Sequence, residues 1–212
     1  MKAAAAAAAL LAAHAACAQD NVPGRRASPP AKPDWEFALT AYPTFVRGGD
    51  TTTSVIGAAD RGALHLEARY GYEAKDSRSA FAGWTFSGGE SIAWEVTPLV
   101  GTAWGPLRAF VPGVEASVAW GRLDFYVEAE FVRDRRNSAD SYDYAWSELG
   151  FRALDWLRIG AVGQRTRSYG GERDFQRGPF AQATFGRATV GCYWFNPGAK
   201  DQVVVASIGM TF

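Results

Sequence analysis

Apolar and polar side chains alternate along most of the chain after residue 34, with a period of two residues. Strands show this period because successive side chains point to opposite faces of a sheet, and helical periodicity is hard to find in this region. The segment 51–59, which begins Thr-Thr-Thr-Ser, is the weakest of the predicted strands. The alternation predicts strands near residues 35–46, 51–59, 62–73, 79–87, 91–103, 107–119, 122–133, 142–153, 156–168, 174–186, 187–196 and 201–212.

The connections between these segments alternate in length. Short turns such as Ser87–Glu90 and Gly186–Arg187 alternate with longer polar loops such as 134–141 and 196–201. Transmembrane barrels combine short turns at one end with longer loops at the other, and termini at the same end require an even number of strands. The sequence therefore predicts an all-β fold over residues 35–212, a closed antiparallel up-and-down transmembrane barrel of about twelve strands. Ten strands are the alternative if 51–59 is a loop.

The two faces of the strands differ in composition. One face is apolar and has aromatic rings near the turns, among them Phe151 and Phe185 at the short-turn end and Tyr70, Tyr72 and Phe110 at the long-loop end. Outer-membrane barrels have two such aromatic girdles. The four lysines, Lys2, Lys32, Lys75 and Lys200, all lie outside the predicted strands. These features favour an apolar face toward lipid over a soluble secreted barrel or sandwich, which would turn that face inward.

The residues on the other face of the strands predict a charged interior. Buried charges need partners, so they either pair and fill the barrel or line a water-filled acidic channel. Inward arginines are not in excess, so the sequence does not predict a basic track for acidic sugars. The predicted lumen network comprises His65, Glu67, Arg69, Glu95, Glu115, Glu128, Glu130, Glu148, Arg152 and Arg158.

The N-terminal segment has the three parts of a secretory signal peptide over residues 1–18. Lys2 precedes an alanine-rich apolar run, and Ala16-Cys17-Ala18 forms an A-x-A cleavage site. Lipidation of Cys17 is the second interpretation, although His14 stands where a lipoprotein signal would have an aliphatic residue. Residues 19–34 are a flexible proline-rich tail, and the barrel over 35–212 completes the predicted organisation.

The last predicted strand ends at Phe212 after the alternating run Val203-Val204-Val205-Ala206-Ser207-Ile208-Gly209-Met210-Thr211. This ending resembles the last strand of bacterial outer-membrane β-barrel proteins, without features that identify a subfamily. The resemblance implies that Phe212 is an assembly signal read by the barrel-insertion machinery. It also implies a location in the outer membrane, in contact with its lipids. We expect a monomer.

Little catalytic chemistry is available to the exported chain. His65 is the single histidine after the signal segment, and we interpret it as a lumen residue in a polar network. A net charge of zero gives no support to nucleic-acid binding. No Cys or His cluster has metal-ligand spacing, so we predict no catalytic residue, metal site or cofactor.

The sequence therefore favours a small pore or a structural envelope protein with an acidic, polar lumen. An outer-membrane enzyme that modifies lipid and a soluble secreted β protein are the alternatives.

Overall fold

The computed structural model describes residues 34–168 and 173–212. The predicted signal peptide 1–18 and residues 19–33 of the predicted tail lie outside the described residues. No helix within the described ranges has the length and apolar character needed to cross a membrane. The strands are β1 (Glu36–Val46), β2 (Thr51–Arg61), β3 (Leu64–Tyr70), β4 (Arg78–Trp84), β5 (Phe86–Gly88), β6 (Ala93–Trp104), β7 (Ala109–Trp120), β8 (Leu123–Asp134), β9 (Tyr142–Leu154), β10 (Leu157–Ser168), β11 (Arg173–Phe185), β12 (Ala188–Phe195) and β13 (Val203–Thr211), with a short 3-10 turn η1 (Ser138–Asp140) before β9.

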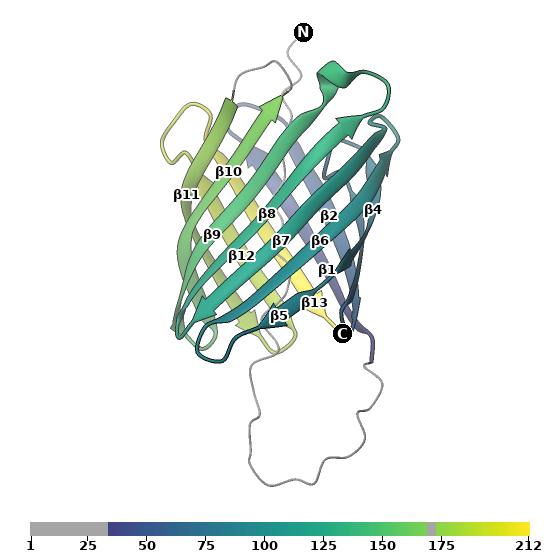
Figure 1. The fold of residues 1–212 in the computed structure, drawn as a ribbon. Coiled ribbons are helices and arrows are strands. Elements are labelled where there is room, and N and C mark those ends of the chain that lie inside the picture. Colours follow the sequence, from purple (N-terminus) through teal and green to yellow (C-terminus); the bar gives the residue numbers. More distant parts are fainter. Residues whose placement is uncertain (1–33, 169–172) are drawn as a thin grey trace, which may run out of the picture.

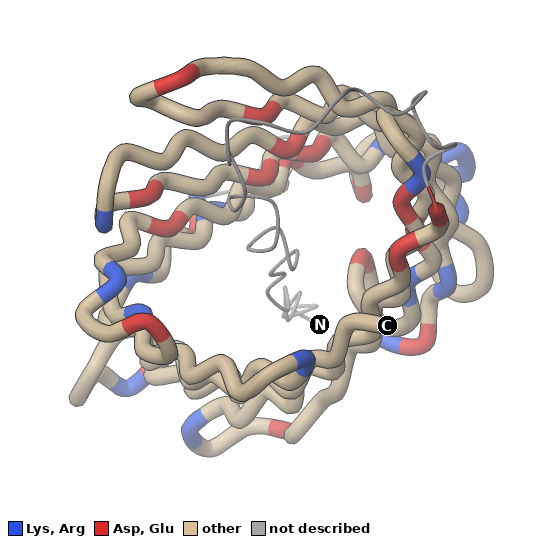
Figure 2. The backbone as a smooth tube through the Cα atoms, turned by 90° about the horizontal axis from the view of Figure 1, so that it is seen from below, with Lys and Arg blue, Asp and Glu red and all other residues tan. Residues whose placement is uncertain are grey.

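These strands form one closed antiparallel sheet (Figures 1 and 2). The last strand, β13, pairs with β1 from Ala38↔Thr211 to Val46↔Val203, which closes the ring. Because β4 and β5 both pair with β6, they occupy one position, and the barrel has twelve strands. The pairings of β1 with β13 and of β4 with β6 close the ring, and only the short β5 is paired on one side alone. The predicted twelve-stranded barrel is confirmed, residues 51–59 belong to β2, and the ten-stranded alternative is wrong.

Two predicted strands differ from the observed ones. The prediction of a strand over 62–73 was wrong at its end, because β3 stops at Tyr70. Gly71 has a positive φ of 66° and its amide donates to Ser77 O at 2.8 Å, which turns the chain back on itself. Tyr72 therefore leaves the strand alternation and is buried at 4% exposure, in place of the predicted position in the outer girdle.

The predicted strand 79–87 is interrupted at Thr85, between β4 and β5. The Thr85 amide donates to Ala63 O at 2.8 Å, and its hydroxyl lies 2.9 Å from the Thr97 hydroxyl. A short break therefore divides one barrel strand into two segments without opening the ring.

Three short turns begin with a glycine. Gly62, Gly121 and Gly186 have φ values of 60°, 59° and 60°. Two-residue hairpins with glycine at the first turn position favour this left-handed region, in which a residue with a side chain is strained. These turns, together with the start of β1 and the end of β13, lie at one end of the barrel, opposite the longer loops (Figure 1).

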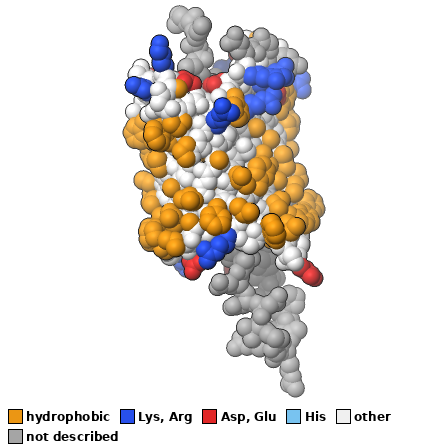
Figure 3. Space-filling view, turned by 90° about the vertical axis from the view of Figure 1, so that its left-hand side faces the viewer, with side chains coloured by type: hydrophobic (Ala, Val, Ile, Leu, Met, Phe, Trp, Pro, Cys, Tyr) orange, Lys and Arg blue, Asp and Glu red, His pale blue; other side chains and the backbone are white. Residues whose placement is uncertain are grey.

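The outer wall is apolar. In Figure 3 hydrophobic side chains cover the wall and charged side chains gather toward its two ends. Exposed Trp and Phe rings include Trp120, Phe151 and Phe185 toward the short turns and Trp104, Phe110 and Trp194 toward the long loops. A soluble protein rarely exposes so continuous an apolar surface.

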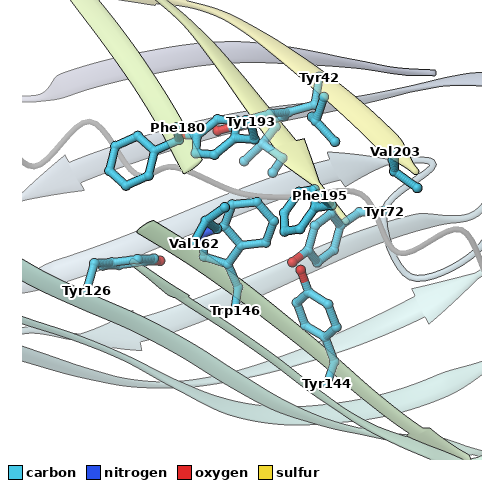
Figure 4. Packing of buried hydrophobic residues seen from close by; sticks show 12 residues of the cluster. Tyr42, Tyr72, Tyr126, Tyr144, Trp146, Val162, Phe180, Tyr193, Phe195 and Val203 are labelled. Atoms are coloured by element: carbon cyan, nitrogen blue, oxygen red, sulfur yellow. The ribbon is translucent and has the colours of Figure 1, made fainter. Parts of the chain in front are cut away.

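Large rings fill part of the interior. Trp146 on β9 is fully buried, and its ring centroid lies 5.2 Å from those of Tyr193 and Phe195 on β12 (Figure 4). A second cluster packs Phe81 of β4 and Leu99 of β6 near Val111 and Val132. These two apolar clusters fill part of the interior beside the charged side chains.

Candidate functional site

The alternation of the strands places a group of glutamates on the inner face. Glu67 and Arg69 come from β3, Glu115 from β7, and Glu128 and Glu130 from β8. In the register of β7 and β8, Glu115 lies directly opposite Glu128. Facing glutamates on neighbouring strands repel one another unless a cation lies between them.

One arginine lies among these carboxylates. The Arg69 Nε donates to Glu67 Oε2 at 2.6 Å, and its Nη1 donates to Glu130 Oε1 at 2.6 Å and to Glu128 Oε1 at 3.3 Å. We call Arg69 together with Glu67, Glu73, Glu115, Glu128 and Glu130 the Arg69 cluster. The remaining two glutamates, Glu73 and Glu115, each have an oxygen 3.9 Å from the guanidinium nitrogens.

Aromatic rings support the guanidinium from the side. Its carbon lies 4.0 Å from the centroid of the Phe81 ring and 4.8 Å from that of Tyr72. Such cation–π contacts are strongest where water is excluded. Gly101 on β6 makes room for the Phe81 ring, which a side chain there would overlap.

The Arg69 cluster spans the interior. Three strand positions, those of β4, β6 and β7, separate β3 from β8 around the ring, so the Arg69–Glu130 ion pair crosses the lumen. The Tyr72 hydroxyl donates to Glu128 at 3.3 Å, and the Tyr142 hydroxyl of β9 donates to Glu73 O at 2.5 Å. These bonds connect the loop after β3 to the opposite wall and narrow the barrel at this level.

His65 lies next to the Arg69 cluster. Its Nδ1 is 2.7 Å from Asp60 Oδ1, and its Nε2 is 3.3 Å from Glu67 Oε1. The imidazole is buried on the inner face, as expected for a lumen residue, and its contacts here are with carboxylates. Among the described residues, His65, Glu67 and Glu115 also offer ligand atoms that lie within 4.8 Å of one another.

A second charged group forms on the wall between β8 and β11. Arg158 of β10 donates from Nε to Asp124 Oδ1 at 2.9 Å, and from Nη1 to Glu148 Oε2 at 2.5 Å and Gln182 Oε1 at 2.7 Å. Its guanidinium carbon lies 4.7 Å from the centroid of Phe180. One arginine here faces two carboxylates, so this group is closer to neutrality than the Arg69 cluster.

The predicted network is thus divided by the structure. His65, Glu67, Arg69, Glu115, Glu128 and Glu130 meet at one level, and Glu148 and Arg158 meet at another. Glu95 is half-buried on β6 and Arg152 is exposed near the end of β9. Neither side chain forms an ion pair with another described residue. Their proposed part in a lumen network stays a prediction.

Some residues of these charged groups were not identified from the sequence. Tyr72 contributes because the loop after β3 turns inward, and strand alternation cannot describe a loop. Asp60 was assigned to a tight turn, yet β2 continues to Arg61 and brings its carboxylate to His65. Glu115 was predicted as a lumen residue, but its meeting with His65 and Glu67 depends on how β3, β4, β6 and β7 are paired and curved, so no local spacing could have shown the grouping.

No family model matches the chain, and no curated protein sequence does. A KdgM porin is similar in structure, with a TM-score of 0.62 at 8% identity over 82% of this chain and 99% of that chain. A KdgM porin in complex with disordered oligogalacturonate gives 0.58 at 7% identity over 82% and 98% of the two chains. A NanC porin gives 0.57 at 9% identity over 83% and 98%. The chain therefore has the fold of the outer-membrane porins, over nearly the whole length of those proteins.

Proposed function

We propose that this protein is a narrow outer-membrane pore that prefers cations. The observation that carries the proposal is the composition of the Arg69 cluster, in which five acidic side chains surround one arginine across the lumen. Rings of acidic side chains select cations in channels, because a passing cation is attracted and an anion is repelled. The porin fold supplies the barrel in which such a cluster would act.

The outer wall supports a membrane location. Its apolar surface is bounded by aromatic side chains toward both ends, as in barrels that span a lipid bilayer. We propose export through the signal segment 1–18, insertion by the barrel-assembly machinery with Phe212 as the assembly signal, and contact with outer-membrane lipids as a monomer. The amide of Phe212 donates to Phe37 O at 2.9 Å, so the terminal residue sits at the seam that closes the barrel.

The acidic interior sets the class of solute. One of the similar structures is a porin in complex with an oligogalacturonate, which is a polyanion. Here the carboxylates of the Arg69 cluster would repel such a chain, as the sequence already indicated. We therefore propose small cations and small neutral solutes as the permeants.

A structural envelope protein is the second candidate. The cross-lumen bonds from Arg69 to Glu130 and from Tyr142 to Glu73 favour it, because they would obstruct a permeant. The contacts of His65 with carboxylates, on the inner face, favour neither a lipid-modifying enzyme nor a nucleophile at the lipid surface.

Planar-bilayer recording distinguishes the candidates. In a salt gradient we expect a small conductance whose reversal potential shows cation preference, and Glu128→Gln with Glu130→Gln should weaken that preference. Glu36→Gln with Glu90→Gln removes the same charge at exposed positions and is the matched control, with little expected effect. Absence of conductance in a folded, inserted barrel would favour the structural role, and anion preference would contradict the proposed selectivity.

A further inference from the structure

Three side chains from two distant strands converge beside Arg69. His65 and Glu67 lie two residues apart on the inner face of β3. Glu115 comes from β7, and β4 and β6 lie between β3 and β7 in the ring. All three are buried, and one ligand atom from each lies within 4.8 Å of the other two. The set comprises one imidazole nitrogen and two carboxylates.

The distance between His65 Nε2 and Glu67 Oε1 suits a small divalent cation. Zinc binds imidazole nitrogen at about 2.0–2.1 Å and carboxylate oxygen at about 2.0–2.2 Å, which places neighbouring ligands of a tetrahedron roughly 3.3–3.5 Å apart. His65 Nε2 and Glu67 Oε1 are 3.3 Å apart. Glu115, whose ligand atom lies within 4.8 Å of the other two, would be the third ligand and leave a fourth position for water.

Asp60 orients the histidine for this role. An ionised carboxylate only accepts hydrogen bonds, so the 2.7 Å contact between Asp60 Oδ1 and His65 Nδ1 places the ring proton on Nδ1. Nε2 faces Glu67 Oε1 at 3.3 Å and is then the nitrogen left to bind a cation, which would displace the proton that it shares with that carboxylate. Carboxylate–histidine pairs of this kind fix the ring and raise its basicity in metal sites.

Glu115 provides an independent observation. Both of its carboxylate oxygens are buried and accept no hydrogen bond from any described residue, and its side chain is 4% exposed. A buried carboxyl group without hydrogen bonds is costly, and a bound cation would supply the partner that its oxygens lack. The Arg69 guanidinium is 3.9 Å away and already binds Glu67 Oε2, so Glu67 could bridge the guanidinium through Oε2 and a metal through Oε1.

We propose that His65, Glu67 and Glu115 form a binding site for a divalent transition-metal cation of the zinc type inside the barrel, with Asp60 as the residue that positions His65. Imidazole and carboxylate ligands suit zinc and its neighbours, and the absence of thiolates disfavours softer ions. The cation would also neutralise part of the negative charge in the Arg69 cluster. Binding can be measured on the barrel in detergent, where conduction plays no part.

The test is a zinc titration of the full-length folded barrel, purified without a polyhistidine tag, against a fluorescent zinc chelator. One zinc per chain is expected. Glu115→Gln should weaken the affinity at least about tenfold, and Asp60→Asn by about 10–100-fold. A wild-type barrel that is folded and takes up no stoichiometric zinc overturns the proposal, whatever the variants do.

Glu128→Gln is the matched control, because Glu128 is buried directly opposite Glu115 and carries the same charge but is not one of the three ligands. It should reduce affinity clearly less than Glu115→Gln does. Equal losses would mean diffuse attraction to an acidic interior and would overturn the site.

Electron paramagnetic resonance of bound copper gives a second readout. Nitrogen hyperfine splitting from one imidazole should be present in the wild type and in Glu128→Gln, and absent in His65→Gln. Splitting that persists in His65→Gln would assign the ligand to another nitrogen and contradict the proposal. Heat-modifiable migration on a gel establishes that each variant is folded.

Discussion

Arg69 is the side chain on which the interior depends most. Its guanidinium is fully buried, binds glutamates from β3 and β8, and lies over the Phe81 ring. A buried ion pair is weak evidence for stability, but removal of one partner leaves the other charge buried and uncompensated. Loss of the arginine should therefore be far more harmful than loss of one glutamate.

Arg69→Met tests this asymmetry. We expect the free energy of unfolding, measured by urea titration in lipid vesicles, to fall by about 3–5 kcal/mol, because several carboxylates lose their shared counter-ion. Arg187→Met, at an exposed turn position, should change it by no more than about 0.5 kcal/mol.

A compensating variant tests whether unpaired carboxylates cause this loss of stability. Glu67→Gln and Glu130→Gln added to Arg69→Met should restore part of the lost stability, since fewer charges are then left unpaired. If Arg69→Met were as stable as the wild type, the arginine would not be holding the Arg69 cluster together.

Phe212 is the second residue whose substitution we expect to affect the barrel strongly. Its ring is 59% exposed on the outer face, and its amide closes the last backbone bond to β1. Phe212→Ser should lower the folded yield in the membrane, both by loss of apolar contact and by loss of the proposed terminal signal.

The control for Phe212→Ser is Phe151→Ser. Phe151 is also a lipid-side ring near the short turns, at 43% exposure, but it lies within the chain. Loss of lipid contact alone is worth at most roughly 1.5–3 kcal/mol for a ring of this size. A similar yield for the two variants, measured as heat-modifiable protein in membranes, would show that the terminal position has no special role.

At the scale of elements, each strand separates lipid-facing from lumen-facing side chains. On β8 Val127 faces outward, and on β7 Ser117 faces inward, directly opposite Glu95 of β6. A one-residue shift in register would exchange these faces completely.

Arginine substitutions test the assignment of faces. Val127→Arg should lower the free energy of unfolding by about 2–4 kcal/mol, because a charged side chain would meet the middle of the bilayer. Ser117→Arg should cost clearly less, since the new guanidinium can pair with Glu95 in a polar interior. The reverse order of costs would mean that inside and outside are misassigned.

For the whole molecule, charged blockers of opposite sign test the proposed acidic constriction. If the pore is open and acidic, a linear polyamine such as spermine should enter the Arg69 cluster and reduce the current in a bilayer recording. A short oligogalacturonate of similar length should leave the current unchanged. Block by the polyanion alone would contradict an acidic constriction.

Much of the architecture was predictable because the relevant signals are local. Period-two alternation identified the strand segments, the alternating loop lengths gave an even number of strands, and each inward position followed from its neighbours in the strand. The inward placement of Glu128 and Glu130, for example, needed only the apolar residues between and beside them. The corrections fall where the chain leaves the strand geometry, at Tyr72 after the positive φ of Gly71 and at Thr85 between β4 and β5.

The amino-acid pattern alone was enough to assign each strand residue to one face of the barrel, because side-chain direction in a strand depends only on parity. Which of those residues meet became visible only in the folded barrel. Arg69 reaches Glu130, 61 positions later in the chain, and His65 meets Glu115 only because the ring brings β3 and β7 to the same height. Those contacts depend on strand register, closure of the ring and the inward loop after β3, which are properties of the assembled sheet rather than of any one segment.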